Sequence, residues 1–419
     1  MDKEDIKTII VDDSKSIRVV LDAILCQLGV TDIVHCGTGV DALAMINAHP
    51  DYYQLLFVDL NMPEMDGMEL IRHLGNQGFK GSIVIISGME IRVINLASEV
   101  ARQNKVHLIG NVVKPIKIDE LQHIFTKFHS LHYRLNTVQK PLSKAELALA
   151  ISEQRIIPYY QPKVDCDTNK VLSIEVLIRI DNPGHGDSIL PERFIKCAED
   201  NDLIDLLTFQ LLPKAIKDFK EMREHFGNSL TLAFNLSPVQ LDDLETPKKL
   251  DALFLEHDID HEQIVIEVTE ECALQTANQL ETLNRLRMKG YGVSLDDFGT
   301  GFTNVTQLKN LPFSEIKIDR SFITDIHQDY FSQVIVNTLV EITQKYDYVL
   351  VAEGIESHDE YEYLKKLNTR MLFQGYLISK PKPKNELVRW FNNWKKMSEA
   401  QSKQDVQSKI RPRSVNKNN

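Results

Sequence analysis

Short apolar runs alternate with amphipathic segments along the first 128 residues of the chain. The runs have the length of strands, and the segments between them have helical spacing. Such alternation predicts a doubly wound α/β unit with a parallel sheet. The predicted strands are Lys7–Val11, Ile33–His35, Leu55–Val58, Ile83–Ile86 and one running into Val112-Val113, and the predicted helices are Ser16–Leu28, Gly39–Ala48, Met68–Leu74, Ile91–Gln103 and one starting near Asp119.

Polar residues follow the strands of this first unit. Asp12 and Asp13 come after the first strand, Asp59 after the third, Ser87 after the fourth and Lys114 after the fifth. Sites in parallel sheets lie beyond the carboxyl ends of the strands, so we expect these side chains to meet. Three carboxylates can hold one Mg²⁺. Lys114 and Ser87 could contact a phosphoryl group on Asp59, so the pattern predicts a phosphorylated aspartate.

A second alternation of strands and helices extends from residue 143 to about residue 396. Side chains alternate between the two faces of a strand, and this test places a polar residue at the carboxyl end of seven strands. A TIM-type barrel would collect these residues at its C-terminal mouth, where such barrels carry their chemistry. The residues so placed are Glu175, Asn235, Glu267, Asp296, Lys317, Glu353 and Gln374.

Adjacent aspartates, Asp296 and Asp297, precede a glycine-bracketed turn and bring the carboxylates of the predicted mouth to five. Without histidine or cysteine, this donor set suits Mg²⁺ or Mn²⁺. Asp296 could bridge two metals, which is the usual clamp for attack on a phosphodiester. Lys317 could orient the attacking water, and Glu353 could accept its proton or hold the second metal. The alternative is a set of buried salt bridges, but five acids against one lysine require a further cation.

Charge and cysteine content narrow the function classes. The net charge of −12 argues against a chain built to sit on nucleic acid or anionic lipid. The five cysteines are scattered, without zinc spacing, as in reduced cytosolic proteins. We find neither a signal peptide nor a membrane-spanning run, and therefore expect a cytoplasmic protein. We place a helical linker at residues 129–142 and a disordered polar tail at residues 397–419.

Residues 5–128 resemble a response-regulator receiver domain, which we place at residues 1–128. The resemblance is carried by the five polar residues above, by Lys114-Pro115 and by the segment Met62-Pro63-Glu64-Met65-Asp66-Gly67. It implies that Asp59 is the phosphoacceptor and that a sensor histidine kinase is the phosphodonor. It also implies one Mg²⁺ on Asp13, Asp59 and the Asn61 carbonyl, with Asp12 assisting. The chain departs from the family at Asn111, where receivers usually carry an aromatic residue.

Residues 143–396 resemble an EAL-domain cyclic di-GMP phosphodiesterase. The motifs that carry the resemblance are Tyr160-Gln161-Pro162, Glu175-Val176-Leu177-Ile178-Arg179, Asn235-Leu236-Ser237, Glu267-Val268-Thr269-Glu270, Asp296-Asp297-Phe298-Gly299-Thr300-Gly301, Lys317-Ile318-Asp319, Glu353-Gly354-Ile355-Glu356 and Gln374-Gly375-Tyr376. The departures from the family pattern are mild: Val176 stands in the signature, and Phe302-Thr303-Asn304 follows the glycine turn.

This second resemblance implies hydrolysis of cyclic di-GMP to linear pGpG and a homo-oligomer. It implies that Glu270 anchors the loop after Asp297. Two Mg²⁺ or Mn²⁺ ions would sit on Glu175, Asn235, Glu267, Asp296 and Asp297. The substrate would meet Gln161, the Leu177 backbone, Arg179, Asp319, Glu356 and Gln374.

Together, the two halves predict a phosphorylation-controlled cyclic di-GMP phosphodiesterase. One alternative is a non-catalytic cyclic di-GMP receptor that acts through protein partners. The complete ligand set favours the enzyme, because degenerate receptors usually lack metal ligands. A third reading is a transcription regulator acting through the basic tail, but we find no DNA-binding domain in the sequence.

Overall fold

The structure is a computed structural model with two compact units, Met1–Gln139 and Lys140–Asn419, which we describe separately. It describes residues 6–50, 52–89, 101, 104, 106–122, 124–125, 128, 141–184, 187–269, 276–299, 311–367 and 370–396. The predicted helix 91–103, most of the predicted linker and the predicted tail lie outside these residues.

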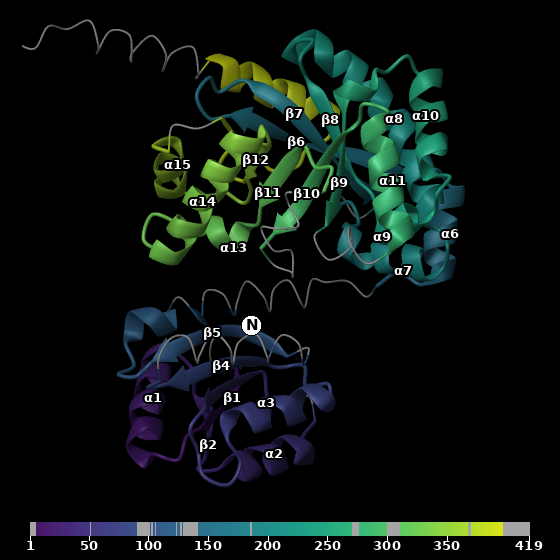
Figure 1. Ribbon diagram of the computed structural model, residues 1–419. Coiled ribbons are helices and arrows are strands. Elements are labelled where there is room, and N and C mark those ends of the chain that lie inside the picture. Colours follow the sequence, from purple (N-terminus) through teal and green to yellow (C-terminus); the bar gives the residue numbers. More distant parts are fainter. Residues whose placement is uncertain are drawn as a thin grey trace, which may run out of the picture. The chain divides into compact units, whose positions relative to one another are not determined.

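The first unit is a five-stranded parallel sheet with the order β2-β1-β3-β4-β5, which confirms the doubly wound prediction (Figure 1). Helix α1 lies on one face and helices α2 and α3 on the other. Residues 118–122 begin a further helix. The elements are β1 Lys7–Val11, α1 Lys15–Gln27, β2 Asp32–Cys36, α2 Gly39–Ala48, β3 Leu55–Asp59, α3 Gly67–Asn76, β4 Ser82–Ser87 and β5 His107–Val113.

Alternate residues of these strands pack into the two hydrophobic cores on opposite faces of the sheet. On β1, Ile9 and Val11 pack toward α2 and α3, while Ile10 packs toward α1. Strands β3 and β4 are buried along their whole length. This is the pattern of a parallel sheet covered on both faces.

The second unit is a closed barrel with the order β10-β11-β12-β13-β6-β7-β8-β9, which confirms the TIM-type prediction. One strand was not predicted: β6 runs antiparallel to both of its neighbours, β7 and β13. The strands are β6 Ile156–Asp165, β7 Val171–Ile180, β8 Thr231–Asn235, β9 Ile264–Thr269, β10 Gly292–Phe298, β11 Glu315–Ile318, β12 Val349–Ala352 and β13 Met371–Phe373.

Two prolines, Pro158 and Pro162, make β6 hard to recognise as a strand in the sequence, because proline has no N–H to donate to a β-ladder. Tyr160 donates its backbone N–H to the Lys382 carbonyl, on the side away from β7. Backbone N–H groups alternate in direction along a strand, so both proline nitrogens also face away from β7. The strand therefore keeps its pairing with β7.

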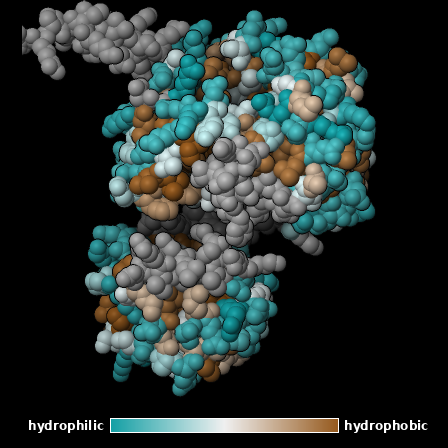
Figure 2. All heavy atoms as spheres, in the orientation of Figure 1, coloured by the Kyte–Doolittle hydropathy of each residue, from teal (hydrophilic) through white to brown (hydrophobic). Residues whose placement is uncertain are grey.

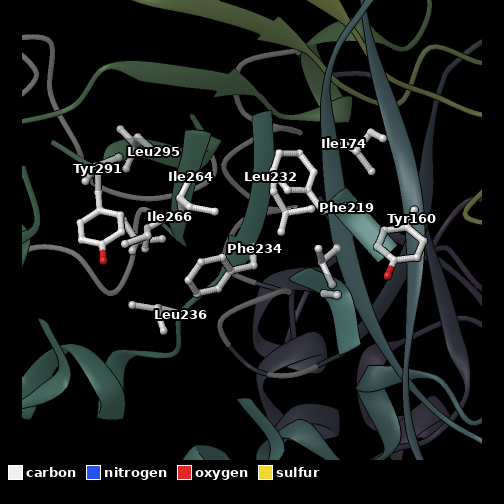
Figure 3. Packing of buried hydrophobic residues seen from close by; sticks show 14 of the residues in the cluster. Tyr160, Ile174, Phe219, Leu232, Phe234, Leu236, Ile264, Ile266, Tyr291 and Leu295 are labelled. Atoms are coloured by element: carbon white, nitrogen blue, oxygen red, sulfur yellow. The ribbon is translucent and has the colours of Figure 1, made fainter. Parts of the chain in front are cut away.

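Helices surround the barrel, and the outward-facing strand residues pack against them (Figures 1 and 3). Leu232 and Phe234 on β8 and Ile264 and Ile266 on β9 belong to this outer core, whereas Glu267 does not. The helices are α6 Lys144–Ser152, α7 Ile195–Asp200, α8 Ile204–Phe226, α9 Pro238–Asp242, α10 Thr246–Glu256, α11 Ala277–Met288, α13 Arg320–Ile323, α14 Tyr330–Tyr346, α15 His358–Lys365 and residues 384–396, with 3₁₀ turns η2 Pro191–Arg193 and η3 His261–Gln263.

The surface of each unit is mostly hydrophilic on the face drawn in Figure 2. Among the described residues, none of the helices combines the length and the apolar character that a bilayer crossing requires.

Candidate functional site

A β-bulge brings Asp296 and Asp297 to the same place at the end of β10. Leu295 pairs with Ile316 and Phe298 with Ile318, so β10 holds one more residue than β11 over this stretch. Asp297 has a φ of 56°, a left-handed conformation that aspartate tolerates better than most residues. Adjacent strand residues normally point to opposite faces. The bulge therefore explains how both carboxylates reach one cluster with Glu353, in which the ligand atoms lie within 4.8 Å of one another.

The Lys317 ammonium lies in the middle of four carboxylates. Its Nζ is 2.7 Å from Glu353 Oε1, 3.0 Å from Asp296 Oδ1, 3.2 Å from Glu267 Oε2 and 3.7 Å from Glu175 Oε2. The four partners come from β7, β9, β10 and the end of β12, so the lysine joins opposite parts of the barrel mouth. Lys317 is buried, and these contacts raise its pKa well above the ordinary value despite the opposing effect of burial.

Glu175 also belongs to an amide network at the mouth. Asn235 donates to its Oε1 at 3.0 Å, and Gln374 donates to its Oε2 at 2.6 Å. Gln374 donates to Gln161 Oε1 at 3.2 Å as well, and Gln161 donates in turn to the Ser379 carbonyl. Gln161 lies opposite Glu175 in the β6–β7 ladder, which explains how a residue in the middle of a strand reaches the mouth.

A second buried lysine, Lys163, was missed in the sequence. Its partner Glu315 shares the inward face of its strand with Lys317 but was not among the predicted site residues. Lys163 Nζ lies 2.6 Å from Glu267 Oε1 and 2.7 Å from Glu315 Oε1. The expectation of one lysine among the acids was therefore wrong. Lys163 stands two residues after Gln161, so the same face test would have found it had β6 been recognised as a strand.

Burial and crowding separate the carboxylates into two protonation classes. Burial, together with repulsion from Glu267 and Asp296, raises the pKa of Glu175 to about 7. Burial and Asp296 raise the pKa of Asp297 to about 6, and burial raises that of Glu353 well above its ordinary value. Burial also opposes the ionisation of Glu267, but Lys163 and Lys317 outweigh it and lower its pKa to about 2.

The donor set fits a divalent metal. Among the described residues, six carboxylates line this part of the barrel against two ammonium groups, so full ionisation would leave an excess of four negative charges. Hard oxygen donors are the ligands of Mg²⁺ and Mn²⁺. Asp296, Asp297 and Glu353 form the cluster whose spacing could hold an ion. Glu175, Asn235 and Glu267 join it through Lys317 and the amide contacts.

The residues expected to meet a substrate are spread around the mouth. Arg179 lies over the ring of Tyr159, and burial lowers its pKa. Asp319 caps α13 by accepting from the Ser321 N–H, and its charge contributes to the raised pKa of Asp297. Glu356 is exposed and paired with Arg320 at 2.8 Å. Leu177, the remaining member of the set, lies on β7 opposite Tyr159.

Glu270 and the segment after the glycine turn, including Phe302-Thr303-Asn304, lie outside the described residues. The expected loop anchor therefore stays a prediction.

The first unit brings its predicted polar residues together at the ends of the strands. Ligand atoms of Asp12, Asp13 and Asp59 lie within 4.8 Å of one another. Lys114 Nζ is 2.8 Å from Asp12 and 3.0 Å from Asp59. Burial raises the pKa of Asp59, with Lys114 opposing, and the Asn61 backbone N–H donates to the carboxylate.

Ser87, the fifth member of that group, is buried, and its Oγ accepts from the Met89 N–H. The three carboxylates suit one Mg²⁺ by the same donor chemistry. Asn111 is exposed on β5.

Fold and site together define a closed barrel with a carboxylate-rich candidate metal centre, joined in one chain to a doubly wound unit with an aspartate–lysine site. The family model of the EAL domain matches residues 144–381, more than half of the chain, and the chain belongs to that family. The family model of the response regulator receiver domain matches residues 8–126. Both sequence resemblances are thereby confirmed.

Known relatives share one or both units. The chain is 27% identical to the cyclic di-GMP phosphodiesterase RocR of Pseudomonas aeruginosa over 92% of this chain and 98% of that protein. It is 32% identical to MucR of the same organism, a bifunctional diguanylate cyclase/cyclic di-GMP phosphodiesterase, over 58% of this chain and 35% of that protein. It therefore spans nearly all of RocR but about a third of MucR.

A solved structure described as the PaMucR phosphodiesterase in complex with c-di-GMP matches with a TM-score of 0.54 and 31% identity. The match covers 58% of this chain and 98% of that chain. This similarity supports the barrel topology of the second unit.

Proposed function

We propose that this protein is a metal-dependent phosphodiesterase that hydrolyses cyclic di-GMP to linear pGpG, and that its receiver unit controls this activity. The observation that carries the proposal is the complete set of acidic side chains around Lys317 in a barrel of the EAL family. The relatives named above, described as cyclic di-GMP phosphodiesterases or bound to c-di-GMP, support the choice of substrate.

Glu175, Asn235, Glu267, Asp296 and Asp297 would hold two divalent ions. Bound there, Mg²⁺ or Mn²⁺ would neutralise charge on the phosphodiester and make a water more acidic. In the overall reaction, the oxygen of a water bonds to one phosphorus and the 3′ oxygen leaves and takes up a proton. Lys317 would orient the attacking water, and the place of its ammonium among the acids of the mouth supports that role.

Glu353 has two roles open to it. Its raised pKa allows it to take a proton near neutral pH, as a general base must. Its place in the cluster with Asp296 and Asp297 supports the second role, as a metal ligand. In either role, Glu353 is required for turnover.

Gln161, Arg179, Asp319, Glu356, Gln374 and the Leu177 backbone would contact the substrate. In the receiver unit, Asp59 would accept a phosphoryl group from a sensor histidine kinase, with Mg²⁺ on Asp13, Asp59 and Asn61 and with Asp12, Ser87 and Lys114 in support. Such a protein would work in the cytoplasm as a homo-oligomer, without contact to DNA or membrane.

The deciding experiment incubates the full chain with cyclic di-GMP and Mg²⁺ and follows pGpG by chromatography, with and without EDTA. We expect pGpG to form in Mg²⁺ and not to form when EDTA removes the metal. Glu353→Gln should abolish turnover, whereas Glu341→Gln, the same substitution on the exposed side of α14, should not. Binding of cyclic di-GMP without turnover in the unmodified protein would favour the receptor instead.

A further inference from the structure

Lys163 is a fully buried charged residue under the barrel mouth. Its side chain has no exposed surface, and its ammonium is shared between Glu267 and Glu315 at 2.6 and 2.7 Å. Ser294 donates to the same Glu315 oxygen at 2.9 Å, which fixes that carboxylate from a third strand. Burying a lysine lowers the stability of the fold unless its charge is fully paired. A specific role for Lys163 would explain why it is buried here.

The contacts of Glu267 suggest that role. Its Oε1 contacts Lys163, and its Oε2 contacts Lys317. Lys163 arrives from β6, which runs against the other strands, and Lys317 arrives from β11. The two lysines therefore hold one carboxylate by its two oxygens and restrict its rotation.

We propose that Lys163 is a positioning residue that fixes Glu267 for divalent metal, while Glu315, itself held by Ser294, fixes Lys163. The inference rests on the proposed function only in requiring that the mouth binds metal. Without Lys163, Oε1 of Glu267 would lose its partner, and the carboxylate would be free to turn toward Lys317. Losing an outer partner of a metal ligand typically costs about 10–100-fold in metal affinity or activity.

The competing explanation is that Lys163 only neutralises Glu315. The two explanations differ for the double variant Lys163→Met/Glu315→Gln. If Lys163 only balances Glu315, then removing both charges restores every property. If Lys163 positions Glu267, the double variant regains stability but not metal affinity. Replacing a buried ion pair by neutral groups of similar size is often harmless to folding, so this variant remains informative if Lys163→Met alone does not fold.

The experiment titrates Mn²⁺ alone into the full chain and counts free Mn²⁺ by electron paramagnetic resonance. All proteins carry Asp13→Asn, which removes a proposed ligand of the receiver site. Urea unfolding in EDTA, followed by tryptophan fluorescence, gives stability. We expect the double variant to bind Mn²⁺ about 10–100-fold more weakly than Glu315→Gln, which keeps Lys163, and to have near-parental stability.

Parental Mn²⁺ affinity in Lys163→Met or in the double variant would overturn the proposal. Because the titration needs no substrate, it is independent of the proposed reaction. If the unmodified protein fails to hydrolyse cyclic di-GMP while the Mn²⁺ result holds, the proposed function fails and the positioning role stands.

Discussion

Replacing Glu175 by glutamine should stabilise the metal-free barrel while removing its activity. The carboxylate has a pKa of about 7 against an ordinary value of 4.5, because burial and its acidic neighbours disfavour the ionised form. An acid whose pKa is raised on folding contributes its stability below the unfolded pKa. That contribution is lost as the pH rises through the folded value. Glutamine has no proton to lose and escapes this penalty.

The size of the effect follows from the two pKa values. Each pH unit between them is worth about 1.4 kcal/mol. The variant should exceed the parent by roughly 1 kcal/mol at pH 5 and by roughly 3 kcal/mol at pH 8, with little further change above pH 7. These are upper values, because neighbouring acids can redistribute the proton.

The hydrogen bonds of the site can adjust to the substitution. Both carboxylate oxygens of Glu175 accept from amide groups, on Asn235 and Gln374, and glutamine offers one oxygen and one NH₂. Among the described residues, Gln374 Oε1 is a buried atom without a hydrogen-bond partner. If the Gln374 amide flips, this oxygen can accept from the new NH₂ group, and the hydrogen bond from Gln374 to Gln161 Oε1 is lost.

The assay is urea unfolding in EDTA at pH 5, 6 and 8, followed by tryptophan fluorescence. Both tryptophans of the chain, Trp390 and Trp394, lie in the barrel unit, so the signal reports that unit alone. A stability difference that does not change with pH, or a variant less stable than the parent at pH 8, would refute the reasoning. Turnover in Mg²⁺ should be lost in the same protein.

Four further outcomes are expected. Mg²⁺ should bind more weakly at pH 6 than at pH 8, because Glu175 and Asp297 then hold protons that metal must displace; pH-independent affinity by calorimetry would contradict this. Asp297→Val should cost about 1–3 kcal/mol of stability and Asp297→Asn much less, because a β-branched residue resists positive φ; equal melting temperatures would argue against a strained bulge. Asp59→Asn should abolish any change of turnover by a small phosphodonor, and an unaltered response would remove Asp59 as phosphoacceptor. Glu270→Ala should lower turnover strongly and blunt that response, since a lost charge-assisted hydrogen bond is worth roughly 1.5–3 kcal/mol; full activity would contradict the anchoring role.

The alternation of side chains along strands explains what the sequence could predict. Seven barrel strands have an inward polar residue near the carboxyl end, and hydrophobic runs mark their outer faces. The eighth strand, β6, was not predicted, because Pro158 and Pro162 argue against a strand unless its pairing partners are known. Lys163 lies on β6 and was therefore not predicted either.

Two features of the site depend on tertiary structure rather than on local pattern. The bulge at Asp296 and Asp297 is defined by the register against β11, which no local pattern contains. The division of the acids into raised and lowered pKa values depends on which lysine contacts which oxygen. In the receiver unit, by contrast, the strands that the site residues follow contain no proline. Asp12, Asp13, Asp59 and Lys114 meet there as predicted.

The extra residue in β10 bears on attempts to transplant this chemistry. A designer who copied the inward-facing acids onto another barrel with a regular strand would place the first aspartate inside and the second outside, among the hydrophobic residues that face the helices. The backbone irregularity would have to be copied together with the side chains. A design would therefore have to transfer the bulged strand β10 together with its partner β11.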